Sequence, residues 1–387
     1  MSAENPADAR KISKWFIVDG HLDLAYNALG WRRDYRRAAR STRQREADSY
    51  VARGAGQCTV GLPDLVCGHV GVVFGTIFLE PAHHMLGEGP LSYRDPDEAH
   101  ELGLAQLDFY HRWADTEPHV HVVENQNDLS NVLSAWHLEA DSTGMLSTQT
   151  ASHGEPVPHQ VGIVPLLEGA DPISEPDELE RWVERGLRVV GPAWAGTRYA
   201  GGTHEPGGFT RLGRELLEVI AGLHLILDVS HLSQKALFEA LEDFQGGPGY
   251  LIASHSNPQR IIQTDRHLPD RAIEMIAERR GVIGVVLFNA FLKRGWGAGS
   301  KKQEVTLDNV VRAIDHVCQV TGSTDYVGLG SDFDGGFGAE SIPRELDTSR
   351  DLYRVGDELL RRGFDYVDVE KVMGVNWLRI LRNTLPS

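Results

Sequence analysis

The sequence predicts an α/β fold, a (β/α)8 TIM-like barrel with insertions. Two observations support this prediction: about eight short apolar segments alternate with helical segments, and 387 residues suit either one large barrel or two domains. No internal repeat or interdomain linker is apparent. We therefore expect one domain over residues 1–387, with residues 30–69 and 80–160 as excursions from the barrel.

The expected strands are short apolar runs. They cover residues 16–18, 70–79, 161–167, 187–194, 224–229, 250–253, 282–288 and 326–329. The run at 70–79, VGVVFGTIFL, is apolar at nearly every position, which is typical of a strand buried on both faces of a parallel sheet. Residues 119–123 are expected to form a further short strand outside this set.

Helical periodicity fills the intervals between these strands. The expected helices cover residues 95–117, 177–186, 212–223, 234–244, 270–280, 307–320, 352–362 and 366–381. The arginine-rich stretch at 31–54 is expected to be a solvated excursion carrying an amphipathic helix, because a run of charges usually marks a solvated face.

Charge and cysteine content exclude several classes of function. Lys and Arg total 38 against 55 Asp and Glu, which gives a net charge of −17 that would repel nucleic acid and anionic membranes. Only three cysteines occur, without a C-x-x-C pair, so we expect no disulfide framework and no thiolate zinc site. The first residues lack the apolar core of a signal peptide, and no apolar run approaches the ~20 residues that cross a bilayer. A cytoplasmic location is the resulting prediction.

Metal-ligand and acid–base side chains follow the expected strands. In a barrel of this type the carboxyl ends of the strands form the active-site face. The candidates at these ends are His21 and Asp23 at the first strand, Glu168 at the third, His231 at the fifth, His255 at the sixth and Asp332 at the eighth. Any one of the histidines alone would more commonly be a hydrogen-bonded core residue. It is the joint pattern that indicates a site.

Imidazole and carboxylate ligands suit zinc and similar ions. Five candidate ligands beside Asp332 exceed the three protein ligands that are usual for one catalytic zinc. We therefore expect two divalent metal ions, Zn²⁺, with Glu168 bridging them. Two cations ~3.5–4 Å apart lower the pKa of a bridging water and supply hydroxide near neutral pH. Asp332 is expected to act as general base and then acid, or to be a sixth ligand.

Two further carboxylates, Asp228 and Asp334, lie near the candidate ligands in the sequence. Orientation of a ligating histidine is one role for Asp228, and a solvated or capping carboxylate is the other.

Seven further segments stand out along nearly the whole chain: GHLDL, LLEG, DVSH, SHSN, the R-x-x-P-D of residues 266–270, GLGSDFDG and GVNWLRIL. In sequence and in order, these segments resemble the membrane (renal-type) dipeptidases of the amidohydrolase superfamily. The resemblance implies that His21, Asp23 and Glu168 hold one zinc ion, and that Glu168, His231 and His255 hold the other. It also implies that Arg266 binds the C-terminal carboxylate of the substrate, a task that suits a planar two-donor fork.

One position departs from the family pattern. Where these dipeptidases usually carry a histidine at the end of the fourth strand, this chain has GPAWAGTRYAGG, which places Trp194 or a neighbour there. That histidine belongs to the substrate pocket, so the departure leaves the metal ligands intact. Trp194 is therefore a candidate substrate-binding residue, and Tyr199 or Arg198 is a candidate to replace the polar contact.

The leading hypothesis is a zinc-dependent, dipeptidase-like hydrolase that cleaves an amide bond adjacent to a free carboxylate by means of a metal-bridged hydroxide. Its expected partner is a small-molecule substrate, a dipeptide, and a homo-oligomer is compatible with the sequence. One alternative is an amidohydrolase of altered specificity, acting on an N-acyl amino acid or another small amide or lactone. The other is a catalytically silent binding barrel.

Overall fold

Eight parallel strands form a nearly closed barrel in the computed structural model, which describes residues 15–84, 90–148 and 158–387. The strands are β1 (Ile17–Leu22), β2 (Val70–Phe78), β8 (Val161–Glu168), β9 (Val189–Gly191), β12 (Ile226–Asp228), β13 (Leu251–Ile252), β14 (Ile283–Val285) and β15 (Val327–Leu329). Their order is β13, β12, β9, β8, β2, β1, β15, β14, and a bridge between Ala253 and Ile283 joins the two ends. The predicted fold class is confirmed.

The strand β8 lies at the centre of the pairing. One edge pairs with β2 from Gly162 to Glu168. The other edge pairs first with β5 (Val120–Val122) and then with β9, where Glu168 lies opposite Gly191. The short strand expected at 119–123 is thus present, outside the eight. β9 ends earlier than predicted, because Pro192 follows it and has no N–H group for the ladder.

Among the described residues, three small two-stranded sheets lie outside the barrel. They are β3 (Glu80–Pro81) with β4 (Ser92–Tyr93), β6 (Leu138–Ala140) with β7 (Leu146–Thr148), and β10 (Ala200–Gly202) with β11 (Glu205–Phe209).

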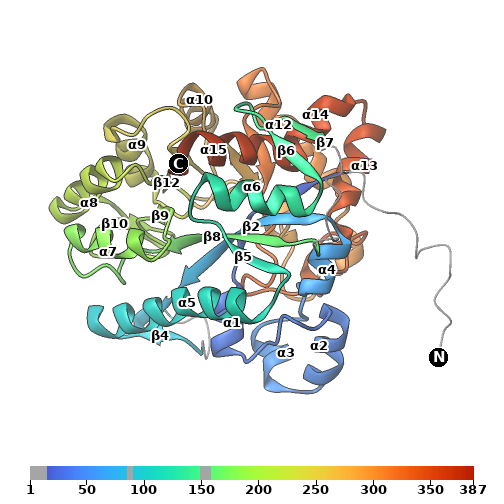
Figure 1. The fold of residues 1–387 in the computed structure, drawn as a ribbon, viewed down its shortest axis with the longest axis horizontal. Coiled ribbons are helices and arrows are strands. Elements are labelled where there is room, and N and C mark those ends of the chain that lie inside the picture. The colour runs from blue at the N-terminus through green and yellow to red at the C-terminus, as the bar shows by residue number, and fades with distance from the viewer. Residues whose placement is uncertain (1–14, 85–89, 149–157) are drawn as a thin grey trace.

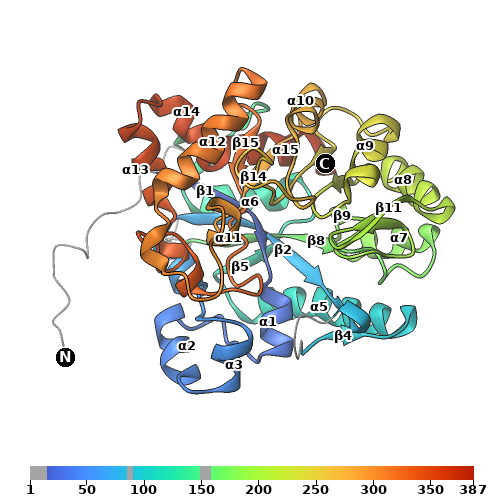
Figure 2. The ribbon, with the colours of Figure 1, turned by 180° about the vertical axis from the view of Figure 1, so that it is seen from behind.

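Helices surround the strands on all sides (Figures 1 and 2). They are α1 (Leu24–Gly30), α2 (Ala39–Glu46), α3 (Tyr50–Gly54), α4 (Leu62–Cys67), α5 (Pro96–Thr116), α6 (Gln126–Ala135), α7 (Leu179–Glu184), α8 (Arg211–Gly222), α9 (Gln234–Asp243), α10 (Asp270–Glu278), α11 (Asn289–Leu292), α12 (Leu307–Thr321), α13 (Tyr353–Arg361), α14 (Tyr366–Glu370) and α15 (Asn376–Thr384). Within the described ranges, none of them has the length and apolar content that a bilayer crossing requires.

The helix expected at 366–381 is not continuous. A π-helical turn at Lys371–Val375 separates α14 from α15. Gly374 in this turn packs against the start of β1, where a Cβ atom would lie 2.6 Å from the carbonyl oxygen of Phe16. The wider π-helical turn thus occurs where Gly374 contacts β1, and the helical periodicity of the sequence does not reveal it.

Trp377 on α15 fills the barrel interior below the strand ends. Its indole Nε1 donates to the carbonyl of Leu329 at 2.9 Å, and its ring lies 5.1 Å from that of Phe74. Above it the strands approach closely: a Cβ atom at Gly284 or at Gly330 would lie 1.9 Å from the carbonyl oxygen of Ser254. The filled interior leaves the carboxyl ends of the strands as the place for a site.

The excursion between β1 and β2 is anchored to the barrel by a buried ion pair. The Arg33 guanidinium lies 3.3 Å from Asp334 and 3.1 Å from Glu46. The Asp334 carboxylate also accepts hydrogen bonds from the backbone N–H and the hydroxyl of Thr59, and from the hydroxyl of Tyr35. The expected helix is present as α2, but the expectation of a fully solvated arginine run was wrong at Arg33, because Asp334 offers this cation a buried partner.

Candidate active site

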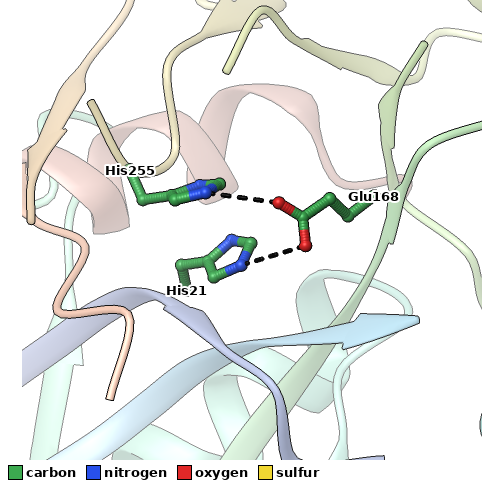
Figure 3. A group of neighbouring side chains, drawn as sticks. All are labelled: His21, Glu168 and His255. Carbon is green, nitrogen blue, oxygen red and sulfur yellow. Dashed lines mark ion pairs between the residues drawn. The ribbon is translucent and has the colours of Figure 1, made fainter. Parts of the chain in front are cut away.

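The predicted ligands meet at the carboxyl ends of the strands. His21 lies in β1 and Glu168 ends β8, whereas His231, His255 and Asp332 follow β12, β13 and β15. Figure 3 shows the side chains of His21 and His255 pointing toward the carboxylate of Glu168. A cavity of about 890 Å³ is lined by Glu168 and by the three residues that follow the strands.

Glu168 presents one oxygen to each of two ligand groups. Its Oε2 lies 3.5 Å from Nε2 of His21, and its Oε1 lies 3.1 Å from Nε2 of His231 and 3.3 Å from Nε2 of His255. Each oxygen of the carboxylate therefore faces a separate group of imidazole nitrogens.

Asp23 reaches the same group by a route that differs from the prediction. Extended backbone through residue 23 would place His21 and Asp23 on one face, but β1 ends at Leu22 and Asp23 directly precedes α1. Oδ1 of Asp23 lies 4.0 Å from Nε2 of His21 and is also contacted by the hydroxyl of Thr76. The helix start, together with the hydrogen bond from β2, therefore orients this carboxylate.

Ser254 orients two of the histidines at once. Its hydroxyl lies 2.5 Å from Oδ2 of Asp228, 2.8 Å from Nδ1 of His255 and 3.3 Å from Nδ1 of His21. A hydroxyl has one donor and two acceptor positions, so donation to Asp228 leaves both lone pairs for the two Nδ1–H groups. Each Nε2 then carries a lone pair and faces Glu168 as a metal ligand would. Asp228 thus acts through Ser254.

The ring of His231 is also oriented by a hydroxyl group, that of Thr203. Its Nδ1 lies 3.0 Å from the hydroxyl of Thr203, and its Nε2 lies 2.9 Å from Nε2 of His255. When both rings carry their proton on Nδ1, two lone pairs and a carboxylate oxygen converge. Tetrahedral ligands with bonds of about 2.0–2.1 Å lie about 3.3 Å apart, close to the separations found between these atoms. Nε2 of His21 is also buried without a hydrogen-bond partner. The donor set therefore fits divalent cations.

The charges of the site favour bound cations. Burial opposes protonation of His21, but the carboxylates of Glu168, Asp23 and Asp332 outweigh it and raise the pKa of this imidazole to about 10. Burial lowers the pKa of His231 to about 4, so this ring is neutral and able to ligate near pH 7. The carboxylates around His21 thus produce an electrostatic field that attracts positive charge.

Two of the site residues adopt the left-handed backbone conformation. His231 has φ 65° and Asp332 has φ 60°. Such values are uncommon for residues other than glycine and cost of order 1–3 kcal/mol where they are strained. Oδ1 of Asp332 lies over Gly335, where a Cβ atom would come within 2.0 Å of it. The backbone therefore sets the direction of both side chains.

Asp332 has the electrostatics of an acid–base group. Its ligand atom lies within 4.8 Å of those of His21 and Asp23. Burial raises its pKa well above the usual range, Asp23 and Glu168 add to this effect, and His21 and Arg266 oppose it. A carboxyl group with a raised pKa can take and return a proton near neutral pH.

Arg266 lies in the cavity wall as a largely buried cation. One terminal nitrogen donates to Ser256 Oγ at 2.9 Å and the other to the carbonyl of His255 at 2.6 Å, while Nε has no hydrogen-bond partner. The guanidinium carbon also lies 5.7 Å from the ring centroid of Phe291. A guanidinium has five N–H groups, so donors remain for an anionic ligand.

Of the three residues proposed for the substrate pocket at the fourth strand, Trp194 lines the cavity, and Tyr199 and Arg198 do not. The ring of Trp194 packs 5.1 Å from that of Phe78. Tyr199 is fully buried and its hydroxyl donates to the carbonyl of Ile173 at 2.5 Å, while Arg198 also donates to this carbonyl. The polar groups of Tyr199 and Arg198 are thus used inside the fold, and the substrate contact expected from one of them stays a prediction.

Several cavity residues were not identified from the sequence. They are Trp31, Arg53, Thr203, His204, Phe288, Phe291 and Phe337. Phe288 ends the run predicted as the seventh strand, so the strand-end rule would have found it. Trp31 and Arg53 come from the excursion between β1 and β2, and nothing in their local sequence pattern points to the cavity.

Taken together, the barrel and the ligand cluster define a metal-dependent hydrolase on an α/β barrel. Residues 7–385 match the family described as membrane dipeptidase, peptidase family M19, and the chain belongs to this family. The predicted family is confirmed.

Three individual proteins are similar to this chain in sequence or in fold. A protein in the pqqA 5′ region of Klebsiella pneumoniae is 32% identical over 58% of this chain and 82% of its own length. Dipeptidase tcpJ of Claviceps purpurea is 32% identical over 45% of this chain and 38% of its own. A metallopeptidase from Rhodobacter sphaeroides, liganded with a phosphinate mimic of the dipeptide L-Ala-D-Ala, has the same fold with a TM-score of 0.72, 24% identity, and coverage of 96% of this chain and 99% of its own.

Proposed function

We propose that this protein is a zinc-dependent dipeptidase that hydrolyses an amide bond next to a free carboxylate. The observation that carries the proposal is the carboxylate of Glu168, whose two oxygens face His21 on one side and His231 with His255 on the other. Family membership adds the expectation of divalent metal and of a dipeptide substrate.

The proposed ligand groups share Glu168. His21, Asp23 and Glu168 would hold one Zn²⁺ ion, and Glu168, His231 and His255 would hold the other. Bound divalent cations lower the pKa of water and polarise a carbonyl oxygen. The hydroxyls of Ser254 and Thr203 keep the Nε2 lone pairs of the histidines directed at these positions.

Arg266 would orient the substrate by its carboxylate. Arg266 lines the cavity, and a partly desolvated guanidinium makes charge-assisted hydrogen bonds of about 1.5–3 kcal/mol. The dipeptide mimic bound to the Rhodobacter sphaeroides metallopeptidase is consistent with a substrate of this size and charge.

Asp332 would move the proton. Its carboxylate takes a proton from the attacking water and returns it to the nitrogen of the leaving amine, so that the amide bond breaks while a carboxylic acid and an amine form. The raised pKa of Asp332 favours proton uptake, and the bare Cα of Gly335 leaves space for the carboxylate to lie where it does.

The cavity wall favours a second candidate, an amidohydrolase that acts on N-acyl amino acids. Trp194, Phe78, Phe288, Phe291 and Phe337 give the cavity an aromatic lining. Its volume lies toward the upper end of the ~300–1,000 Å³ range of ligand pockets. An apolar acyl group would bury more surface here than the side chain of a small dipeptide. The complete set of ligand side chains argues against the catalytically silent barrel.

We also propose a cytoplasmic location, supported by the small number of cysteines and by the free state of the described ones. The net charge of −17 argues against nucleic acid as a partner.

The test combines metal counting with a substrate panel. The purified protein is reloaded with Zn²⁺, metal is measured by elemental analysis, and hydrolysis is assayed on L-L and L-D dipeptides beside N-acyl amino acids. We expect at least two Zn²⁺ per chain and the highest kcat/KM on a dipeptide. Fewer than one ion per chain would refute the metal centre, and a preference for N-acyl amino acids would favour the second candidate.

A further inference from the structure

A second group of metal-ligand side chains lies at the rim of the cavity. His83 and His84 belong to the 3-10 helix Ala82–His84 that follows β3, and Glu205 begins β11. Nε2 of His83 lies 3.1 Å from Oε1 of Glu205, and Nε2 of His84 contacts the same oxygen. One ligand atom from each residue lies within 4.8 Å of the other two. None of the three belongs to the centre around Glu168.

The position of the Glu205 carboxylate depends on a glycine. A Cβ atom at Gly196 would lie 2.1 Å from Oε2 of Glu205 and 2.9 Å from its Cβ atom. The side chain of Glu205 thus occupies the space that any larger residue at 196 would need. On the other side, the rings of His83 and His84 lie 5.0 Å apart at an angle of 53°, with both Nε2 atoms directed at Glu205. The three side chains converge from two separate segments.

The chemistry of this group matches a borderline divalent cation. Two imidazoles and one carboxylate are a ligand set found in zinc sites that keep a fourth position open. The side chains of His83, His84 and Glu205 are 66%, 25% and 34% exposed, so a cation could enter and leave directly from solvent. As a plain ion pair the contact would contribute little, since exposed pairs are typically worth about 0–1 kcal/mol.

We propose that His83, His84 and Glu205 form an additional, exchangeable Zn²⁺ site at the rim of the cavity. The site is independent of the proposed function, because it shares no ligand with the centre around Glu168. The residues on either side of Glu205, His204 and Pro206, line the cavity, as does Glu80 just before the 3-10 helix. A cation held here would join two segments of the rim that are far apart in the sequence.

The experiment measures Zn²⁺ bound at equilibrium. Full-length protein is dialysed against a series of buffered free Zn²⁺ concentrations, and bound metal per chain is compared between wild type and the double variant His83→Gln/His84→Gln. We expect the wild type to bind one more Zn²⁺ per chain than the variant, whatever number the central site holds. Equal numbers in the two proteins would overturn the proposal. An unchanged midpoint of denaturant unfolding without added metal shows that the variant is folded.

Two further variants separate a built site from general binding to surface histidines. Gly196→Ala alters no ligand but displaces the Glu205 carboxylate, so we expect at least a ten-fold loss of affinity for the additional Zn²⁺. Unchanged affinity would overturn the three-residue site. His316→Gln is the control, because His316 forms an isolated pair with Asp270 at 2.7 Å. It should bind as much Zn²⁺ as wild type, and a loss of one ion would also overturn the proposal.

Discussion

The floor and the rim of the cavity are built in different ways. On the floor, the buried residues are His21 in β1, Glu168 at the end of β8 and His255 after β13, and the hydroxyl of Ser254 contacts the rings of both histidines. The rim consists of connecting segments, with Trp31 and Arg53 from one excursion and His204 from the turn between β10 and β11. In barrels of this kind the strand ends carry the reactive groups, and the connecting segments around them determine which substrates can enter.

The largest effect on Zn²⁺ content and on kcat is expected for a substitution of Glu168, the side chain that the two proposed ligand groups share. Glu168→Gln removes the charge that faces all three histidines, so the floor loses its bridging ligand. We expect the Zn²⁺ content to fall by two ions per chain relative to wild type, and kcat to fall by more than the about 10²–10⁴-fold expected for an acid–base group. Elemental analysis and steady-state kinetics measure both. A variant that bound as much Zn²⁺ as wild type would show that Glu168 does not bridge two ions.

Asp332→Asn tests a floor residue that is proposed to act without being required for metal binding. The amide cannot take up the proton, so kcat should fall about 10²–10⁴-fold while the Zn²⁺ content stays that of wild type. Parallel metal analysis and kinetics distinguish the roles: loss of metal together with activity would make Asp332 a ligand instead.

Ser254→Ala removes a hydroxyl that touches neither substrate nor metal in the proposed arrangement. Both His21 and His255 lose the acceptor for Nδ1–H, and we expect metal affinity to fall about 10–100-fold. The matched control is Ser256→Ala, because the hydroxyl of Ser256 accepts a hydrogen bond from Arg266 and, within the described part of the chain, forms no hydrogen bond with a histidine ring. It should raise KM with unchanged metal affinity, as measured by titration with a chelator. Equal metal affinity in the two variants would refute the orienting role of Ser254.

On the rim side, Trp194→Ala should alter specificity and leave the floor intact. Loss of the indole enlarges the cavity near Phe78, so KM for substrates with an apolar N-terminal group should rise about 10-fold while Zn²⁺ content is unchanged. A uniform drop in kcat for every substrate would instead indicate that Trp194 supports the chemistry itself.

The smallest effect is expected for Tyr199→Phe. Its hydroxyl donates inside the fold to Ile173, whose carbonyl also accepts from Arg198, so no buried group is left without a partner. The free energy of unfolding should fall by about 0.5–1.5 kcal/mol, with KM unchanged within about two-fold. Denaturant unfolding and kinetics provide the check, and a large rise in KM would restore Tyr199 to the substrate pocket.

Much of the floor could be predicted because its signals are local. An apolar run predicts a buried strand, and a polar residue directly after it falls on the active-site face of a barrel, which placed His231, His255 and Asp332 correctly at that face. The same rule could not give the backbone conformations, because φ 65° at His231 and φ 60° at Asp332 result from how the following loops pack.

Most residues of the cavity rim could not be predicted from local sequence patterns. Trp31 and Arg53 belong to an arginine-rich stretch whose pattern indicates a solvated excursion, and the ion pair between Arg33 and Asp334 that holds it joins residues about 300 positions apart. Nor does the sequence relate Glu205 to His83 and His84, since their approach depends on how the β10–β11 hairpin lies against the segment after β2.

By itself, the sequence determined the order of the eight barrel strands and of the main helices between them, the family, and the identity of the side chains at the strand ends. The tertiary structure decided how those side chains act together: that the oxygens of Glu168 divide between two groups, that one hydroxyl at Ser254 serves both His21 and His255, and that Tyr199 turns inward. The physical reason is that periodicity and strand-end position are properties of short segments. A hydrogen bond between residues 21 and 254 exists only after the barrel has closed.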